Sequence, residues 1–281
     1  VKEKTGYSYP VTVFVLLLCI GIYLLNMYQI LNIQKKEQVK TVLMTPVQYY
    51  LLFDVPHILI EMDQYIRKQD VDLTKDLKKL PDKVQKKMDE IEKIPYWKGF
   101  YDLFFDVVVK KEKIDEFPPL FEKIRKGDVW RVFSPAFLHT NFLHILFNML
   151  WLWFLGKQIE QRISKFRYIF LILFIAAITN TLQYLMSGPY FLGYSGVIMG
   201  MVGFIWMRQK KAPWEGYPLQ KTTLLFILIF IFAMFALSLF SFFFEMFGKE
   251  FFAVPVANTA HIAGGITGVL LGRSNFFGEA S

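Results

Sequence analysis

The sequence is poor in the residue types that build covalent or metal-bound cores. Among its 281 residues there is one cysteine, Cys19, which stands in an apolar run. A single cysteine excludes an intrachain disulfide framework and a cysteine-rich metal site. Histidine is also scarce, with four copies, and the apolar runs described below contain no Asp or Glu. We therefore expect no metal and no cofactor, and the lack of intramembrane acids argues against a small transporter or channel.

Apolar residues, in contrast, are abundant and clustered. Hydrophobic residues make up 54% of the chain, with 30 phenylalanines. Six runs are apolar enough to span or enter a bilayer: 10–30, 141–156, 168–186, 195–207, 222–244 and 253–272. A spanning helix needs about 20 residues, whereas 13 residues give a helix of roughly 20 Å. The sequence thus predicts an all-α integral membrane protein with six transmembrane helices, the fourth of which begins at Ser195 partway down the membrane.

Charge in the short loops predicts the orientation. Loops 157–167 and 208–221 each carry four Lys or Arg residues against one Glu, while 187–194 is uncharged. The positive-inside rule then places both termini in the cytoplasm and the beginning of run 195–207 toward the outside. The net charge of +8 has this membrane explanation, so no nucleic-acid partner is expected. A signal peptide is an alternative for run 10–30, but its length favours an uncleaved anchor. Without a transit-type beginning, a bacterial inner membrane is the simplest expectation.

The long first loop, residues 31–129, differs from its surroundings in composition. It contains 19 Lys/Arg and 18 Asp/Glu residues, so it is highly charged and nearly neutral. Apolar residues recur at helical spacing over 71–94, interrupted by Pro81. We expect an outward-facing, partly helical appendage that rests on the membrane surface. His57 within it is interpreted as incidental.

Polar residues inside the apolar runs are the candidates for chemistry. His144 and Asn148 are four apart and share a helix face, whereas His139, five residues before His144, is expected to point elsewhere. His261 lies in the last run. For any one of them, an interhelical hydrogen bond is the plain explanation, as close helix packing is for Ser195. Their co-occurrence favours serine hydrolysis instead.

Serine is a weak nucleophile that needs an adjacent base, and His261 can serve if the two helices touch. Small residues recur along both helices, at Gly196, Gly200 and Gly203 and at Ala260, Gly264, Gly268 and Gly272, and such stripes permit close approach. The Ser195 amide in a first helical turn, with His144 and Asn148, would stabilise an oxyanion. Because no carboxylate is available in these helices to orient His261, we infer a dyad rather than a triad.

Several motifs, taken in order, resemble the rhomboid family of intramembrane serine proteases. They are the pair Trp130–Arg131, the pattern of His139, His144 and Asn148, Glu160-x-Arg162, "GYSG" over 193–196, and "AHIAGGITG" over 260–268. The resemblance covers about 118–273, and run 10–30 fits the six-helix architecture of that family without carrying a motif.

The resemblance implies a role for each residue. Ser195 would be the nucleophile and His261 the base, with His144, Asn148 and the Ser195 amide forming the oxyanion hole. The supporting residues would be His139 as a structural hydrogen-bonder, Arg131 with Glu160 or Arg162 as a brace for the first loop, Trp130, and the glycines Gly193, Gly196, Gly264 and Gly268. Asn258 would lie near the substrate. Met199 occupies a position that is often aromatic in the family, and its thioether can pack against the histidine ring.

The implied activity is cleavage of single-span or multi-span membrane proteins near the outer membrane boundary, within the lipid bilayer, by a Ser195–His261 dyad through an acyl-enzyme. The alternative is a catalytically weak relative that binds membrane clients. The expected division is a tail and first helix over 1–30, a charged first-loop insertion over 31–117, a catalytic core over 118–273 and a short cytoplasmic tail over 274–281.

Overall fold

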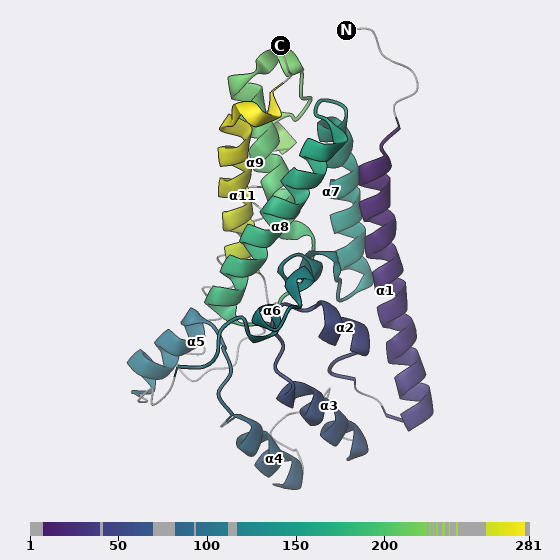
Figure 1. Cartoon of the computed structure of the whole chain (residues 1–281), viewed down its shortest axis with the longest axis vertical. Helices are drawn as coiled ribbons and strands as arrows, with labels where there is room; N and C mark the ends of the chain where they lie inside the picture. The colour runs from purple at the N-terminus through teal and green to yellow at the C-terminus, as the bar shows by residue number, and fades with distance from the viewer. Residues whose placement is uncertain are drawn as a thin grey trace.

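The computed structural model describes residues 8–39, 42–69, 82–92, 94–111, 117–223 and 257–278, and single positions between 225 and 240. Over these ranges the chain is helical and contains no strand. The long helices are α1 (Pro10–Glu37), α7 (Phe142–Glu160), α8 (Lys165–Ser187), α9 (Ser195–Lys211) and α11 (Asn258–Arg273). They lie side by side in one bundle, with the start of α1 and the end of α11 at the same end of it (Figure 1).

Three of these helices, α1, α7 and α8, are long and apolar enough to cross a membrane. Each begins where the sequence supplies a start signal. Pro10 occupies the first turn of α1, where a missing N–H costs nothing. The side chains of Asn141 and Ser164 accept hydrogen bonds from the amides of the first turns of α7 and α8.

The helices run further than the apolar runs that predicted them. Helix α1 continues to Glu37 and α7 continues to Glu160, because Lys, Gln and Glu are good helix formers that extend a helix beyond its apolar part. Helix α9 begins at Ser195, as predicted, but ends at Lys211, four residues beyond its apolar run. Run 222–244 and the beginning of run 253–272 lie largely outside the described residues.

Helices α9 and α11 pack backbone against backbone, which confirms the contact that their small residues predicted. A Cβ added at Gly268 would lie 2.7 Å from the carbonyl carbon of Gly200, and one at Gly264 would lie 3.1 Å from that of Gly196. A Cβ at Gly203 would collide with the carbonyl oxygen of Gly265. The glycines therefore set the distance between these two helices.

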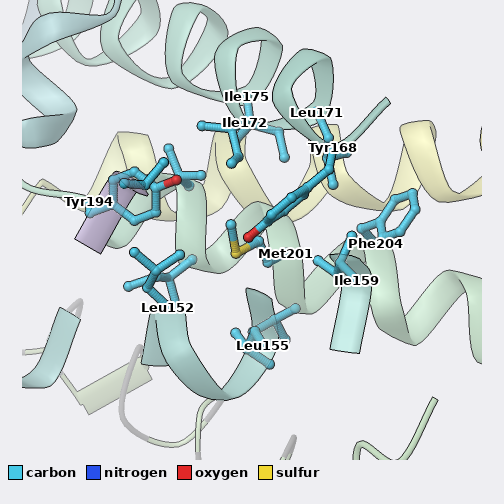
Figure 2. Close-up of a cluster of buried hydrophobic side chains, with 14 of the residues drawn as sticks. Leu152, Leu155, Ile159, Tyr168, Leu171, Ile172, Ile175, Tyr194, Met201 and Phe204 are labelled. Atoms are coloured by element: carbon cyan, nitrogen blue, oxygen red, sulfur yellow. The ribbon is translucent and has the colours of Figure 1, made fainter. Parts of the chain in front are cut away.

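The apolar core lies among α7, α8 and α9. Figure 2 shows Leu152 and Leu155 from α7 facing Tyr168 and Ile172 from α8, with Met201 of α9 between them. All of these side chains are buried. This core holds α9 against α7 and α8 over much of its length.

The first loop is partly helical, as predicted, but it is more than an appendage. It contains α2 (Pro46–Leu51), α3 (Ile58–Lys68), α4 (Asp82–Glu92), α5 (Phe100–Phe104), a π-helical turn (Phe105–Val109) and α6 (Glu122–Arg125). Figure 1 shows α3 and α4 beyond the end of the bundle. Of the predicted helical stretch 71–94, the part before Asp82 is outside the described residues.

Residues around Phe53 are inserted into the bundle itself. Phe53 is fully buried and its ring stacks on that of Tyr184 in α8, with centroids 4.7 Å apart. The Asp54 carboxylate accepts hydrogen bonds from the Tyr184 hydroxyl (2.7 Å) and from the amides of Glu122 (3.0 Å) and Lys123 (2.8 Å). One carboxylate thus joins the beginning of the first loop, its end and α8.

Candidate active site

The candidate site is centred on a serine and a histidine from α9 and α11. The Oγ of Ser195 lies 2.7 Å from Nε2 of His261, a hydrogen-bond distance. Both residues are half-buried. For Nε2 to accept the hydroxyl proton, the imidazole must carry its own proton on Nδ1. This geometry is that of a hydroxyl paired with a general base.

The local sequence explains why α9 begins at Ser195. Gly193 has φ +121°, a conformation that L side chains rarely adopt, and its amide donates to the carbonyl of Pro135 (3.0 Å). The chain turns there and enters the helix after Tyr194, whose side chain forms no capping hydrogen bond. The amides of the first turn, including that of Ser195, have no intrahelical partners and favour negative charge.

His144 lies directly beside this turn. A Cβ added at Gly193 would be 2.7 Å from both Cε1 and Nε2 of the His144 imidazole. The other ring nitrogen, Nδ1, lies 3.2 Å from Oγ1 of Thr140. The Nε2 edge of His144 therefore faces the turn that leads into Ser195, and glycine at 193 is required by space as well as by conformation.

Asn148 lies one turn further along α7 and is buried. Its Nδ2 donates to the backbone carbonyl of His144 at 2.8 Å. This bond uses one of the two amide protons and fixes the orientation of the side chain, so one proton is left to donate elsewhere.

The structure corrects the placement of His139. It was expected to point away from His144, but α7 begins only at Phe142, so helical spacing does not apply to it. The two rings meet edge to face, with centroids 5.1 Å apart. Neither ring nitrogen of His139 has a partner at the distance and angle of a normal hydrogen bond among the described residues, so its role as a structural hydrogen-bonder stays a prediction. Burial, aided by the neighbouring His144, lowers the pKa of His139 to about 3, and its ring is neutral.

Arg131 and Trp130 both hold the first loop. Arg131 does so without Glu160 or Arg162, one of which was expected to share this role with it. Arg131 is buried and donates to the carbonyls of Tyr49 (2.6 Å) and Leu52 (2.7 Å). The Nε1 of Trp130 donates to the carbonyl of Tyr50 (3.1 Å). These bonds fasten the end of the loop to its own beginning.

Glu160 and Arg162 lie at the end of the bundle where α1 begins. The Glu160 carboxylate accepts from the amides of Val11 (2.8 Å) and Thr12 (2.9 Å), which caps the N-terminus of α1. Arg162 donates to the carbonyls of Glu215 (2.8 Å) and Gly216 (2.7 Å). The expected contact of Arg131 with Glu160 or Arg162 is wrong, because two charged residues that are close in the sequence do not show which residues elsewhere in the chain they bind.

One residue near the site was missed by the sequence analysis. Gln183 of α8 is buried, and its Oε1 accepts from the amide of Ala260 at 2.9 Å. Ala260 directly precedes His261, so this bond fixes the first turn of α11. A glutamine in an apolar run is itself a signal, since buried polar groups in a membrane need partners.

The two remaining predicted residues lie on the same two helices. Asn258 is the first residue of α11, and its buried Oδ1 has no hydrogen-bond partner within the described ranges. Met199 is partly buried and packs against the main core. Over the same ranges, no three His, Cys, Asp or Glu side chains gather in a group suited to a metal ion.

The molecule thus belongs to the class of helical membrane bundles that carry a serine–histidine pair at the start of two closely packed helices. Residues 126–276 match the sequence model of the rhomboid domain. The rhomboid protease GlpG of Salmonella paratyphi A is 36% identical over 151 residues, which cover 54% of this chain and 50% of that protein. The rhomboid protease GlpG of Klebsiella pneumoniae is 36% identical over 144 residues, covering 51% and 48%.

The chain belongs to the rhomboid family, and it is an integral membrane protein. It spans about half the length of the curated relatives that it matches.

Proposed function

We propose that this chain is an intramembrane serine endopeptidase that cleaves transmembrane segments of other membrane proteins near the outer membrane boundary. The observation that carries the proposal is the 2.7 Å separation between Ser195 Oγ and His261 Nε2. The related GlpG proteins are rhomboid proteases, which supports the same reaction class.

In the proposed reaction, Ser195 Oγ attacks the carbonyl carbon of the scissile peptide bond while its proton passes to His261 Nε2. The resulting oxyanion is stabilised by the Ser195 amide, the His144 imidazole and the free amide proton of Asn148. His261 then protonates the departing amine, which leaves an acyl-enzyme on Ser195. A water molecule deprotonated by His261 hydrolyses the ester and regenerates the hydroxyl.

The chain itself supplies every group that these steps require. Gln183 positions the first turn of α11 through Ala260, and the glycine contacts keep α11 against α9. Asn258 lies in that same first turn, close to where a substrate chain must pass to reach Ser195. Met199, which packs against the main core, stands at the position that is often aromatic in the family.

For the membrane arrangement, we propose six spans, with α9 and α11 and the run 222–244 joining α1, α7 and α8. The basic residues at the end of the bundle where α1 begins and α11 ends support a cytoplasmic position for that end. The site then opens to the extracytoplasmic side of a bacterial inner membrane. The division into a first-loop insertion over 31–117 and a core over 118–273 belongs to the same proposal, with the insertion anchored on the core through Asp54 and Arg131.

The test is cleavage of a labelled single-span protein in proteoliposomes by the unaltered chain, Ser195→Ala and His261→Ala. We expect cleavage by the unaltered chain and at least a ~10³-fold lower rate for each variant, as for other hydrolases of this chemistry. Ile262→Ala, an exposed change next to the proposed base, is the matched control and should cleave normally. No cleavage by the unaltered chain, with client binding retained, would favour a catalytically weak client-binding protein instead.

A further inference from the structure

The segment that follows Gly99 exposes an unusual amount of apolar surface. Over Phe100–Val109, the exposed large side chains are Phe100, Tyr101, Phe104, Val107, Val108 and Val109. Phe104 and Val108 are 56% and 55% exposed. Contiguous apolar patches of this kind mark a surface that is covered by something else.

The polar residues of this segment are confined to one side. Asp102 and Asp106 are four residues apart and share a helix face, whereas Phe100, Phe104 and Val108 follow one another at the same spacing on the opposite face. Asp106 pairs with Lys110 at 2.8 Å. The segment is thus amphipathic, with one acidic edge and one broad aromatic and aliphatic face.

The start of the segment is fixed to the end of a membrane-spanning helix. A Cβ at Gly99 would lie 2.6 Å from the backbone of Ser187, and one at Gly188 would lie 2.7 Å from the carbonyl oxygen of Lys98. Trp97 Nε1 donates to the carbonyl of Tyr184 (2.9 Å). The segment therefore begins at the depth where α8 leaves the membrane.

A second contact keeps it at this depth. The Tyr101 hydroxyl lies 3.3 Å from Oγ1 of Thr259, in the first turn of α11. Figure 1 shows α5 projecting sideways from the end of α8, whereas α3 and α4 lie further out along the long axis of the bundle.

We propose that residues 100–109 form an interfacial anchor whose apolar face lies in the lipid–water boundary of the bilayer, at the end of the bundle where α8 ends. Amphipathic helices that lie in the membrane interface bury their apolar face about 5–10 Å into the headgroup and acyl boundary. Tyr101, which is exposed, and Lys110 at the end of the segment supply the aromatic and snorkelling side chains that are typical of this zone. A strip of ten residues is smaller than the roughly 20–30 residues that each side of a stable protein interface contributes, so lipid is the favoured occupant.

The anchor is independent of the proposed proteolysis and is tested on the intact chain in proteoliposomes. In a Cys19→Ala background, a nitroxide is attached at Phe104→Cys or Val108→Cys. Lys86→Cys on α4, also exposed, is the matched control. Relaxation of each nitroxide is measured with oxygen, which concentrates in lipid, and with a water-soluble nickel chelate.

At Phe104→Cys and Val108→Cys we expect oxygen to relax the nitroxide severalfold more effectively than the nickel chelate does. At Lys86→Cys we expect the nickel chelate to be the more effective of the two. Preferential relaxation by nickel at either anchor position would overturn the proposal. Exclusion of both reagents, with spin–spin broadening that grows with protein density, would overturn it in favour of a contact between copies of the chain. Two labelled positions are used so that a structural defect in one variant, detected by its melting profile, leaves the other to decide.

Discussion

Replacing Gly268 by alanine tests whether the contact between α9 and α11 sets the geometry of the site. The added Cβ would lie 2.7 Å from the carbonyl carbon and 2.9 Å from the Cα of Gly200. An ordinary contact begins at 3.4 Å, and the carbonyl oxygen of Gly200 lies closer to the added Cβ than these two atoms do, so the helices must separate by more than about 0.7 Å at this point. Both colliding groups are backbone, so no side-chain rotation can relieve the overlap.

Two consequences follow from this separation. Overpacking of a close interface costs about 1–3 kcal/mol of stability. Because Ser195 and His261 are carried by the two separated helices, their 2.7 Å hydrogen bond lengthens as well. A displacement near 1 Å at reacting groups lowers a rate by about 100-fold.

The matched control is Gly265→Ala on the same helix. A Cβ at Gly265 meets no described atom within 4 Å, so the substitution adds only the helix propensity of alanine, up to about 1 kcal/mol in favour of folding. Thermal unfolding in detergent and the cleavage rate in proteoliposomes are measured for both variants. Equal stability and equal rates for the two variants would refute the claim that Gly268 sets the helix spacing.

Three further predictions concern residues around the site. Gln183→Leu leaves the Ala260 amide without its acceptor and should lower stability by about 1–3 kcal/mol, with a fall in kcat that exceeds any change in KM. The pKa of His139 is lowered to about 3 in the folded chain, so between pH 3 and 6.5 the unfolded chain binds more protons at this residue than the folded chain does. The free energy of unfolding should therefore fall by about 2 kcal/mol on going from pH 7 to 5. His139→Phe should remove that share of the pH dependence in melting experiments. Asp54→Ala leaves three donors unpaired and should cost about 3 kcal/mol or more, accompanied by faster proteolysis of the first loop, whereas unchanged proteolysis would show that the loop is held elsewhere.

The sequence predicted those features that depend on local patterns. The start of α9 at Ser195 follows from a glycine turn next to an apolar run, and the contact between α9 and α11 follows from small residues at helical spacing. Each pattern can be recognised within its own segment of the sequence, without knowledge of the rest of the fold. The roles of Ser195 and His261 stay predictions that await the experiments above.

Features that depend on distant partners were not predictable in the same way. His139 was assigned a direction from helical spacing, but the helix begins after it, and boundaries are the least certain part of any sequence-based assignment. The partners of Arg131 and Glu160 lie about 80 and 150 residues away in the sequence. The insertion of Phe53 against Tyr184 likewise depends on tertiary packing and has no local signature.

The most direct test of the central claim is covalent labelling of Ser195 in the intact chain. A fluorophosphonate probe reacts when the serine Oγ displaces fluoride from phosphorus, which requires an activated hydroxyl. Peptide mass spectrometry after labelling in detergent should find the probe on Ser195 in the unaltered chain, and labelling should be greatly reduced in His261→Ala. Labelling of Ser195 that is undiminished in His261→Ala, or no labelling of Ser195 at all, would contradict the account.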